Sequence, residues 1–61
     1  MKELTIDEVV RRLIDGLDKE KDFQLIKKWL WEFQTANQMS LKELDDLCWK
    51  DSIWIFEQIY G

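Results

Sequence analysis

The chain of 61 residues has no proline, no histidine, only two glycines and a single cysteine, Cys48. One cysteine cannot form a disulfide within the chain, and an unpaired thiol is typical of a reducing compartment. Without histidine, one thiol cannot supply the nitrogen and sulfur ligands that zinc usually takes. The sequence also lacks a signal-peptide pattern and any run of about 18 apolar residues, which a membrane span would need. We therefore expect a cytoplasmic protein with no metal, no cofactor and no membrane association.

What the chain does contain is mainly apolar and charged residues, with the apolar residues more numerous. Hydrophobic residues make up 46% and charged residues 36%, and this composition is too apolar for a disordered chain. A length of 61 residues is too short for two separate hydrophobic cores. We expect a single domain over residues 1–61. A domain of this size buries only about 60% of the surface that its unfolded chain exposes, so its stability is marginal unless another chain completes the core.

The negative charge is concentrated in the second half of the chain. Residues 1–30 hold seven basic and seven acidic residues, whereas residues 31–61 hold two basic and six acidic ones, so the net charge of -4 arises entirely after residue 30. Nucleic acids and anionic lipids usually require a basic footprint. This distribution of charge therefore disfavours nucleic-acid binding as the function, and it is compatible with a protein partner that has a basic surface.

Helical periodicity extends over almost the whole chain and predicts three helices, over about 6–16, 19–36 and 41–60. Thr5 with Glu8 and Ser40 with Glu43 form capping-box patterns that start the first and third helices, and Gly16 suits the end of the first. The apolar stripe of the first helix comprises Ile6, Val9, Val10, Leu13, Ile14 and Leu17. The apolar arc of the second comprises Phe23, Leu25, Ile26, Trp29, Leu30 and Phe33, with Trp31 outside it.

The third helix presents a conflict, because apolar residues fall on both of its sides. One stripe comprises Leu41, Leu44, Leu47, Cys48, Ile55 and Ile59, with Asp51 interrupting it. A second stripe on nearly the opposite face comprises Trp49, Ile53, Phe56 and Tyr60. A small monomeric bundle cannot bury both faces of one helix. Either the helix is continuous and two-faced, or it breaks at Asp51 and Ser52, so that a short fourth segment lays its aromatic residues over the same core.

We favour the two-faced alternative, in which the aromatic face of the C-terminal half packs against another chain, because the chain contains four tryptophans, three phenylalanines and one tyrosine. The predicted apolar contacts are Trp49, Ile53, Trp54, Phe56 and Tyr60, with Trp31 as an outlying anchor. The predicted acidic rim is Glu43, Asp45, Asp46 and Glu57. A homodimer is the simplest expectation, and a larger protein with a basic surface is the alternative.

Residues 37–59, "NQMSLKELDDLCWKDSIWIFEQI", resemble the helix-turn-helix segment of phage repressors, in which a Ser-capped helix leads through a turn to a recognition helix. The resemblance implies DNA binding and transcriptional regulation as the alternative function. The sequence departs from that pattern in three ways. Asp45 stands where a small residue is usual, Trp49 stands where the turn glycine is usual, and the segment in the place of the recognition helix has no Arg or Lys.

No catalytic constellation is evident in the sequence. Without histidine, the available bases are carboxylates and lysines on helical faces, and the adjacent Asp45 and Asp46 point about 100° apart on a helix, so they do not form a dyad. Cys48 is read as a core residue, because its acidic neighbours oppose formation of a thiolate. We expect a non-enzymatic inhibitor, antirepressor or assembly adaptor. By analogy of size and charge, such a protein fits a phage or mobile element.

Overall fold

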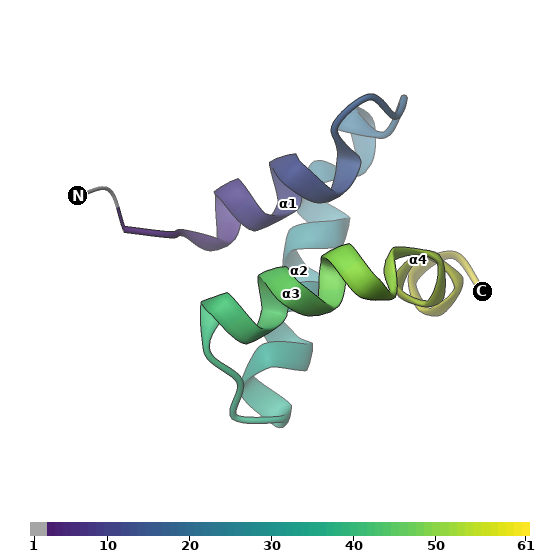
Figure 1. Cartoon of the computed structure of the whole chain (residues 1–61). Coiled ribbons are helices and arrows are strands. Elements are labelled where there is room, and N and C mark those ends of the chain that lie inside the picture. Colours follow the sequence, from purple (N-terminus) through teal and green to yellow (C-terminus); the bar gives the residue numbers. More distant parts are fainter. Residues whose placement is uncertain (1–2) are drawn as a thin grey trace.

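The computed structural model describes residues 3–61 and shows an all-α domain (Figure 1). Four α-helices follow one another along this part of the chain: α1 (Ile6–Ile14), α2 (Phe23–Ala36), α3 (Leu41–Lys50) and α4 (Ser52–Tyr60). A short 3-10 helix, η1 (Glu20–Asp22), precedes α2. In Figure 1, α1 and α3 lie in front of α2, and α4 continues from the far end of α3. The all-α class predicted from the sequence is confirmed, with four helices in place of three.

The starts of α1 and α3 follow the predicted caps. The Thr5 hydroxyl accepts a hydrogen bond of 3.3 Å from the backbone N–H of Glu8, and the Ser40 hydroxyl accepts one of 3.1 Å from the N–H of Glu43. Each of these bonds satisfies a backbone donor at a helix start that has no partner within the helix. Both capping residues therefore fix the direction in which the chain enters its helix.

The ends of α1 and α2 depend on residues in the left-handed conformation. Gly16 has φ of 78°, two residues after the last residue of α1, which ends slightly earlier than predicted. Gln38 has φ of 53°, and the backbone N–H of Met39 donates to the carbonyl of Gln34 across the end of α2. This bond, with that from Gln38 to Thr35, forms a Schellman motif, which satisfies carbonyls at the helix end.

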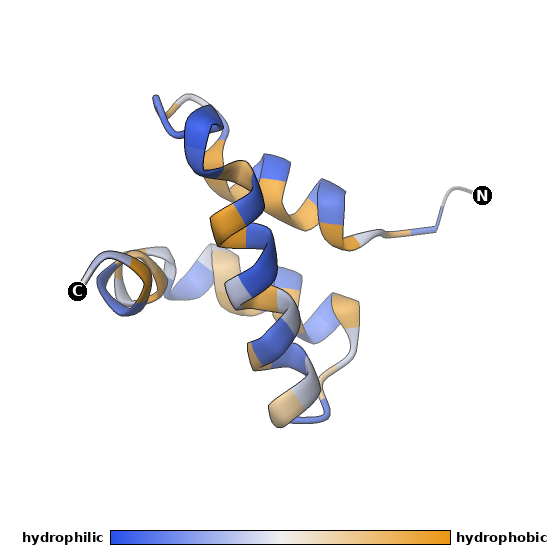
Figure 2. Cartoon of the chain, turned by 180° about the vertical axis from the view of Figure 1, so that it is seen from behind, coloured by the Kyte–Doolittle hydropathy of each residue, from blue (hydrophilic) through white to orange (hydrophobic). Residues whose placement is uncertain are grey.

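All four helices contribute to one apolar core. Its buried members are Val9, Val10, Leu13, Ile14, Ile26, Leu30, Leu44, Cys48 and Ile55. Figure 2 shows the apolar side of α1 turned toward the other helices and its charged side turned outward. The predicted core role of Cys48 is confirmed. The prediction for Leu25 is wrong, because its position lies at the edge of the apolar arc of α2 and the side chain is half exposed.

A break at Asp51 separates α3 from α4, so the expectation of one continuous helix over 41–60 is wrong and the alternative of a broken helix is confirmed. Asp51 has φ of -127° and ψ of 39°, outside the helical region, and its side chain makes no capping hydrogen bond to α4. The break lets α4 change direction and place Ile55, which has no exposed surface, in the core with Leu44 and Cys48. A helix that changes direction need not bury two opposite faces in one place.

Ion pairs join α1 to both α3 and α2. Arg12 Nη1 lies 2.8 Å from Asp45 Oδ2 on α3, and Lys27 Nζ on α2 lies 2.7 Å from Asp7 Oδ1. Both pairs are partly exposed, so each contributes at most about 1 kcal/mol to stability. Their positions help to fix the register of α1 on α3 and α2 above the core.

Candidate protein-binding surface

The break at Asp51 divides the predicted aromatic face among different surroundings. Trp49 lies near the end of α3 with 77% of its surface exposed, and Ile53 lies in the first turn of α4 with 76% exposed. These two residues have the largest exposed fractions of the large apolar residues that the structure places on the surface. We call them the Trp49–Ile53 corner. Full burial of a large apolar side chain contributes about 1.5–3 kcal/mol of free energy. Because both side chains of the corner are exposed in the isolated chain, this free energy is available for binding a partner.

Trp54 points to another part of the domain and joins an aromatic cluster with α2. Its ring lies edge-on to Trp29 at 6.2 Å and edge-on to Phe33 at 5.9 Å between centroids, while Trp29 stacks on Phe33 at 5.1 Å. Such pairs add about 0.5–1.5 kcal/mol beyond the area that they bury. Trp54 is still 42% exposed. It therefore has an intramolecular role in holding α4 to α2, and it does not form one continuous stripe with Trp49.

Phe56 and Tyr60 both lie near the segment that precedes α2, although Tyr60 keeps 45% of its surface exposed, so only Phe56 departs from the expected outward face. Phe56 is partly buried against the core, and the Lys19 ammonium lies 5.8 Å from its ring centroid and 4.6 Å from that of Tyr60. The Tyr60 hydroxyl donates a 2.8 Å hydrogen bond to Asp22 Oδ2. Partial burial and this bond to Asp22 raise the pKa of Tyr60 above its ordinary value of 10.0. The end of α4 is therefore anchored to the segment that precedes α2.

The predicted acidic rim is similarly divided. Asp46 and Glu57 are exposed, as expected of a rim, whereas Glu43 is exposed and also accepts a 3.4 Å hydrogen bond from the Ser40 hydroxyl. Asp45 departs from the expectation, because Oδ2 is paired with Arg12 and the side chain is only 14% exposed. Its charge is therefore partly neutralised within the domain. Trp31, the predicted outlying anchor, lies on α2 with 56% of its surface exposed.

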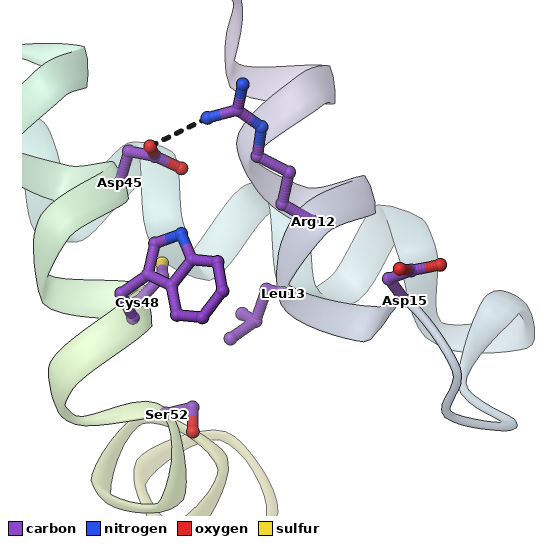
Figure 3. Close-up of a pocket in the computed structure, with 7 residues that line it drawn as sticks. Arg12, Leu13, Asp15, Asp45, Cys48 and Ser52 are labelled. Carbon is purple, nitrogen blue, oxygen red and sulfur yellow. Dashed lines mark hydrogen bonds and ion pairs between the residues drawn. The ribbon is translucent and has the colours of Figure 1, made fainter.

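An open groove of about 680 Å³ lies between α1 and α3 beside the Trp49–Ile53 corner (Figure 3). Its lining residues are Arg12, Leu13, Asp15, Asp45, Cys48, Trp49 and Ser52. Figure 3 shows Arg12 and Asp45 directed toward each other from the two helices, with Leu13 on the α1 side and Cys48 on the α3 side. Asp45 Oδ1 is buried and has no hydrogen-bond partner within residues 3–61. The groove therefore combines an indole, an apolar floor and two carboxylates.

Cys48 lies in this groove as an unreactive thiol. Burial, together with the nearby charge of Asp45, raises its pKa from 9.0 to about 11, so the thiolate that nucleophilic chemistry requires is scarce at neutral pH. In the part of the chain that the structure describes, no three side chains of His, Cys, Asp or Glu are grouped so as to hold a metal ion. Over the same residues, no helix is long and apolar enough to cross a membrane.

The contribution of α1 to this surface was not predicted from the sequence. No binding role was predicted for Arg12 or Asp15, and nothing in the local pattern indicates that they lie opposite α3. Lys19 and Trp29 are similar cases, because their contacts with α4 depend on the turn at Asp51. No family matches this chain, and no curated protein or solved structure matches it significantly.

Proposed function

We propose that this protein is a protein–protein interaction module that binds its partner through the Trp49–Ile53 corner. The observation that supports this function is the exposure of an indole and of the isoleucine four residues later in the chain, at 77% and 76%, on a domain that buries its other isoleucines fully or partly. Aromatic side chains offer a large contact area at a small cost in rotamer entropy, and they are enriched among the residues that dominate interface energies. The corner adjoins a groove that a protruding side chain of the partner can enter.

The mode of action that fits such a surface is occupation of a site on another protein, as an inhibitor, an antirepressor or an assembly adaptor. A homodimer is the simplest form of the interaction, since a two-fold axis would pair the corner with its own copy. A DNA-binding function has less support. The connection between α3 and α4 is the single residue Asp51, and α4 carries one acidic and no basic residue for phosphate contacts.

The test compares partner capture by the full-length chain and by two variants. Trp49→Ala with Ile53→Ala removes both side chains of the corner, whereas Leu25→Ala removes a half-exposed apolar side chain of α2 that is not assigned to the surface. We expect the double variant to lose capture of proteins from a cell extract, and Leu25→Ala and the wild type to capture the same proteins. Far-UV circular dichroism should show equal helix content in all three. Capture that is equal in all three would refute the proposed surface.

Light scattering on a sizing column tests the homodimer directly. A dimer held by the corner should have a mass near twice 7.5 kDa and revert to the monomer mass in the double variant. A dimer that persists in the double variant would assign self-association to another surface. A monomer at every concentration would exclude the homodimer and direct the search to a different protein.

A further inference from the structure

The groove beside Trp49 has the electrostatic character of a cation site. Its charged lining residues are Arg12, Asp15 and Asp45, one positive and two negative, so the lining has a net charge of -1. Asp46, Lys50 and Asp51, all exposed, flank Trp49 in the chain and together add one negative charge nearby. No lining residue other than Arg12 is basic, and Arg12 is already engaged by Asp45 Oδ2 at 2.8 Å. The surplus charge at the groove is therefore negative.

Three helix ends lie at the groove, and their partial charges offset one another in part, because the N-terminus of α4 at Ser52 is positive and Lys50 already lies at the C-terminus of α3. The last residues of α1 and α3 are Ile14 and Lys50, and the groove is lined by Asp15 just after one end and by Trp49 just before the other. Carbonyl groups at a helix C-terminus carry a partial negative charge, which favours a cation within about one turn. Figure 1 shows α1 and α3 running in the same general direction, so these two ends lie on the same side of the molecule.

The Asp45 carboxylate adds an incomplete hydrogen-bond set. An ionised carboxylate accepts several hydrogen bonds, but Arg12 supplies a bond to Oδ2 alone, and Oδ1 has no donor within the described chain. Figure 3 shows the second oxygen of Asp45 directed toward the space between α3 and α1. Because Oδ1 is buried, a partner's side chain does not reach it directly. The carboxylate therefore acts on a cation in the groove through its charge, at longer range.

We infer that this groove is the receptor for a lysine or arginine side chain of the protein partner, which lies against the Trp49 indole and pairs with the exposed carboxylate of Asp15. Asp45, paired with Arg12, acts on that side chain at longer range. This inference rests on the proposed function and specifies the partner's chemistry. A cationic group within about 6 Å of an indole is attracted by the ring in addition to the carboxylates. A second copy of the chain is a less suitable occupant, because it also carries a net charge of -4.

The test uses a probe of defined chemistry on the ¹⁵N-labelled full-length protein. An acetylated and amidated Gly-Arg-Gly peptide is titrated in low salt, and the matched peptide carries citrulline, which keeps the shape of arginine without its charge. We expect the arginine peptide to shift the amide signals of Leu13 and Ser52 and the indole N–H signal of Trp49, with saturation. The citrulline peptide should bind at least ~5-fold more weakly, and salt should weaken the arginine peptide because it screens the carboxylates.

Matched variants locate the binding. Trp49→Ala should weaken the peptide ~2- to 5-fold, which corresponds to a cation–π contact at an exposed site. Asp15→Asn should weaken it, whereas Asp46→Asn removes the same charge from an α3 residue outside the groove lining and should have less effect. The two Asn variants have equal net charge, so general attraction of a basic peptide to an acidic protein predicts equal losses. Equal losses, or equal binding of the citrulline peptide, would overturn the inference.

The outcome also separates this inference from the proposed function. If the arginine peptide fails to shift the groove signals while partner capture still depends on Trp49 and Ile53, the groove does not receive a basic side chain and the interaction surface stands. If capture is also independent of the corner, the proposed function fails as well. A homodimer that depends on Trp49 and covers the groove would likewise overturn the assignment of a basic partner.

Discussion

Replacing Phe56 with alanine tests the most consequential feature of the fold, which is the return of α4 to the core after Asp51. In a continuous helix, Phe56 would share an outward face with Trp49, and truncating either residue would affect the stability of the monomer little. In the structure, Phe56 packs against the core and lies near the ammonium of Lys19, whereas Trp49 is 77% exposed. The two truncations should therefore have very different effects.

The magnitude follows from the area that Phe56 buries. Covering roughly 100 Å² of the ring at about 25 cal/mol per Å² contributes about 2.5 kcal/mol, from which the entropy of fixing the side chain is subtracted. We expect Phe56→Ala to lower the free energy of unfolding by ~2 kcal/mol. A 61-residue domain has a total stability of about 3–9 kcal/mol, so the variant would lose a large share of it. Trp49→Ala should change stability by no more than ~0.5 kcal/mol.

Urea denaturation followed by circular dichroism at 222 nm measures both variants without using tryptophan fluorescence. With a slope of about 1 kcal/mol per molar urea for a domain of this size, Phe56→Ala should lower the midpoint by ~2 M and leave the slope unchanged. Ile53→Ala serves as a second exposed control on the same helix as Phe56. The measurement must be made where light scattering shows a monomer. A loss of several kcal/mol with Trp49→Ala in the monomer would refute both the assigned exposure and the interaction surface.

Three further perturbations address single contacts. The thiol of Cys48 ionises near pH 9.0 when unfolded and at about 11 when folded, so the unfolded chain releases its proton first and stability should fall between these pH values. The full shift corresponds to about 2.7 kcal/mol of unfolding free energy, which solvent screening reduces to on the order of 1–2 kcal/mol. Urea titrations at pH 8 and pH 11 should show that Cys48→Ala loses less unfolding free energy between these two pH values than the wild type does. An equal loss in both proteins would contradict the assignment. Tyr60→Phe removes the hydrogen bond to Asp22 and should cost ~0.5–1 kcal/mol in the same assay; no change would mean that the bond is not formed in solution. Gly16→Ala should lower the free energy of unfolding by ~1–2 kcal/mol, because φ at this position is 78°, even though an added Cβ would meet no atom within 4 Å. Gln38→Gly should stabilise the protein, because glycine adopts the φ of 53° at this position without strain. The melting temperatures of the two variants should therefore shift in opposite directions.

Local interactions explain why much of the fold was predictable from the sequence. The hydroxyls of Thr5 and Ser40 bond to backbone N–H groups three residues away, so the starts of α1 and α3 depend on neighbours in the sequence alone. The apolar stripe of α1 repeats with the helical period, which identified Val9 and Leu13 as core residues before any packing partner was known. The negative charge of the second half and the unpaired cysteine are likewise properties of composition.

The groove and the exposed corner could not be predicted in this way, because they depend on which helices face each other. Asp45 was assigned to a free acidic rim, and only the packing of α3 against α1 brings Arg12 to 2.8 Å from it. Asp15 was not identified at all, since a carboxylate after the end of a helix has no local feature that points to a groove. Contacts between residues 33 positions apart leave no periodic trace in the sequence.

The C-terminal segment shows where sequence determined the outcome and where tertiary structure decided it. The sequence by itself determined that residues 41–60 are helical, that Ile55 belongs to an inner face, and that one continuous helix would have too many apolar residues to bury. Only the tertiary structure decided between a continuous helix and a break, because Asp51 is compatible with both local conformations. Burial of Ile55 and Phe56 against the core favours the break, which leaves Trp49 and Ile53 exposed.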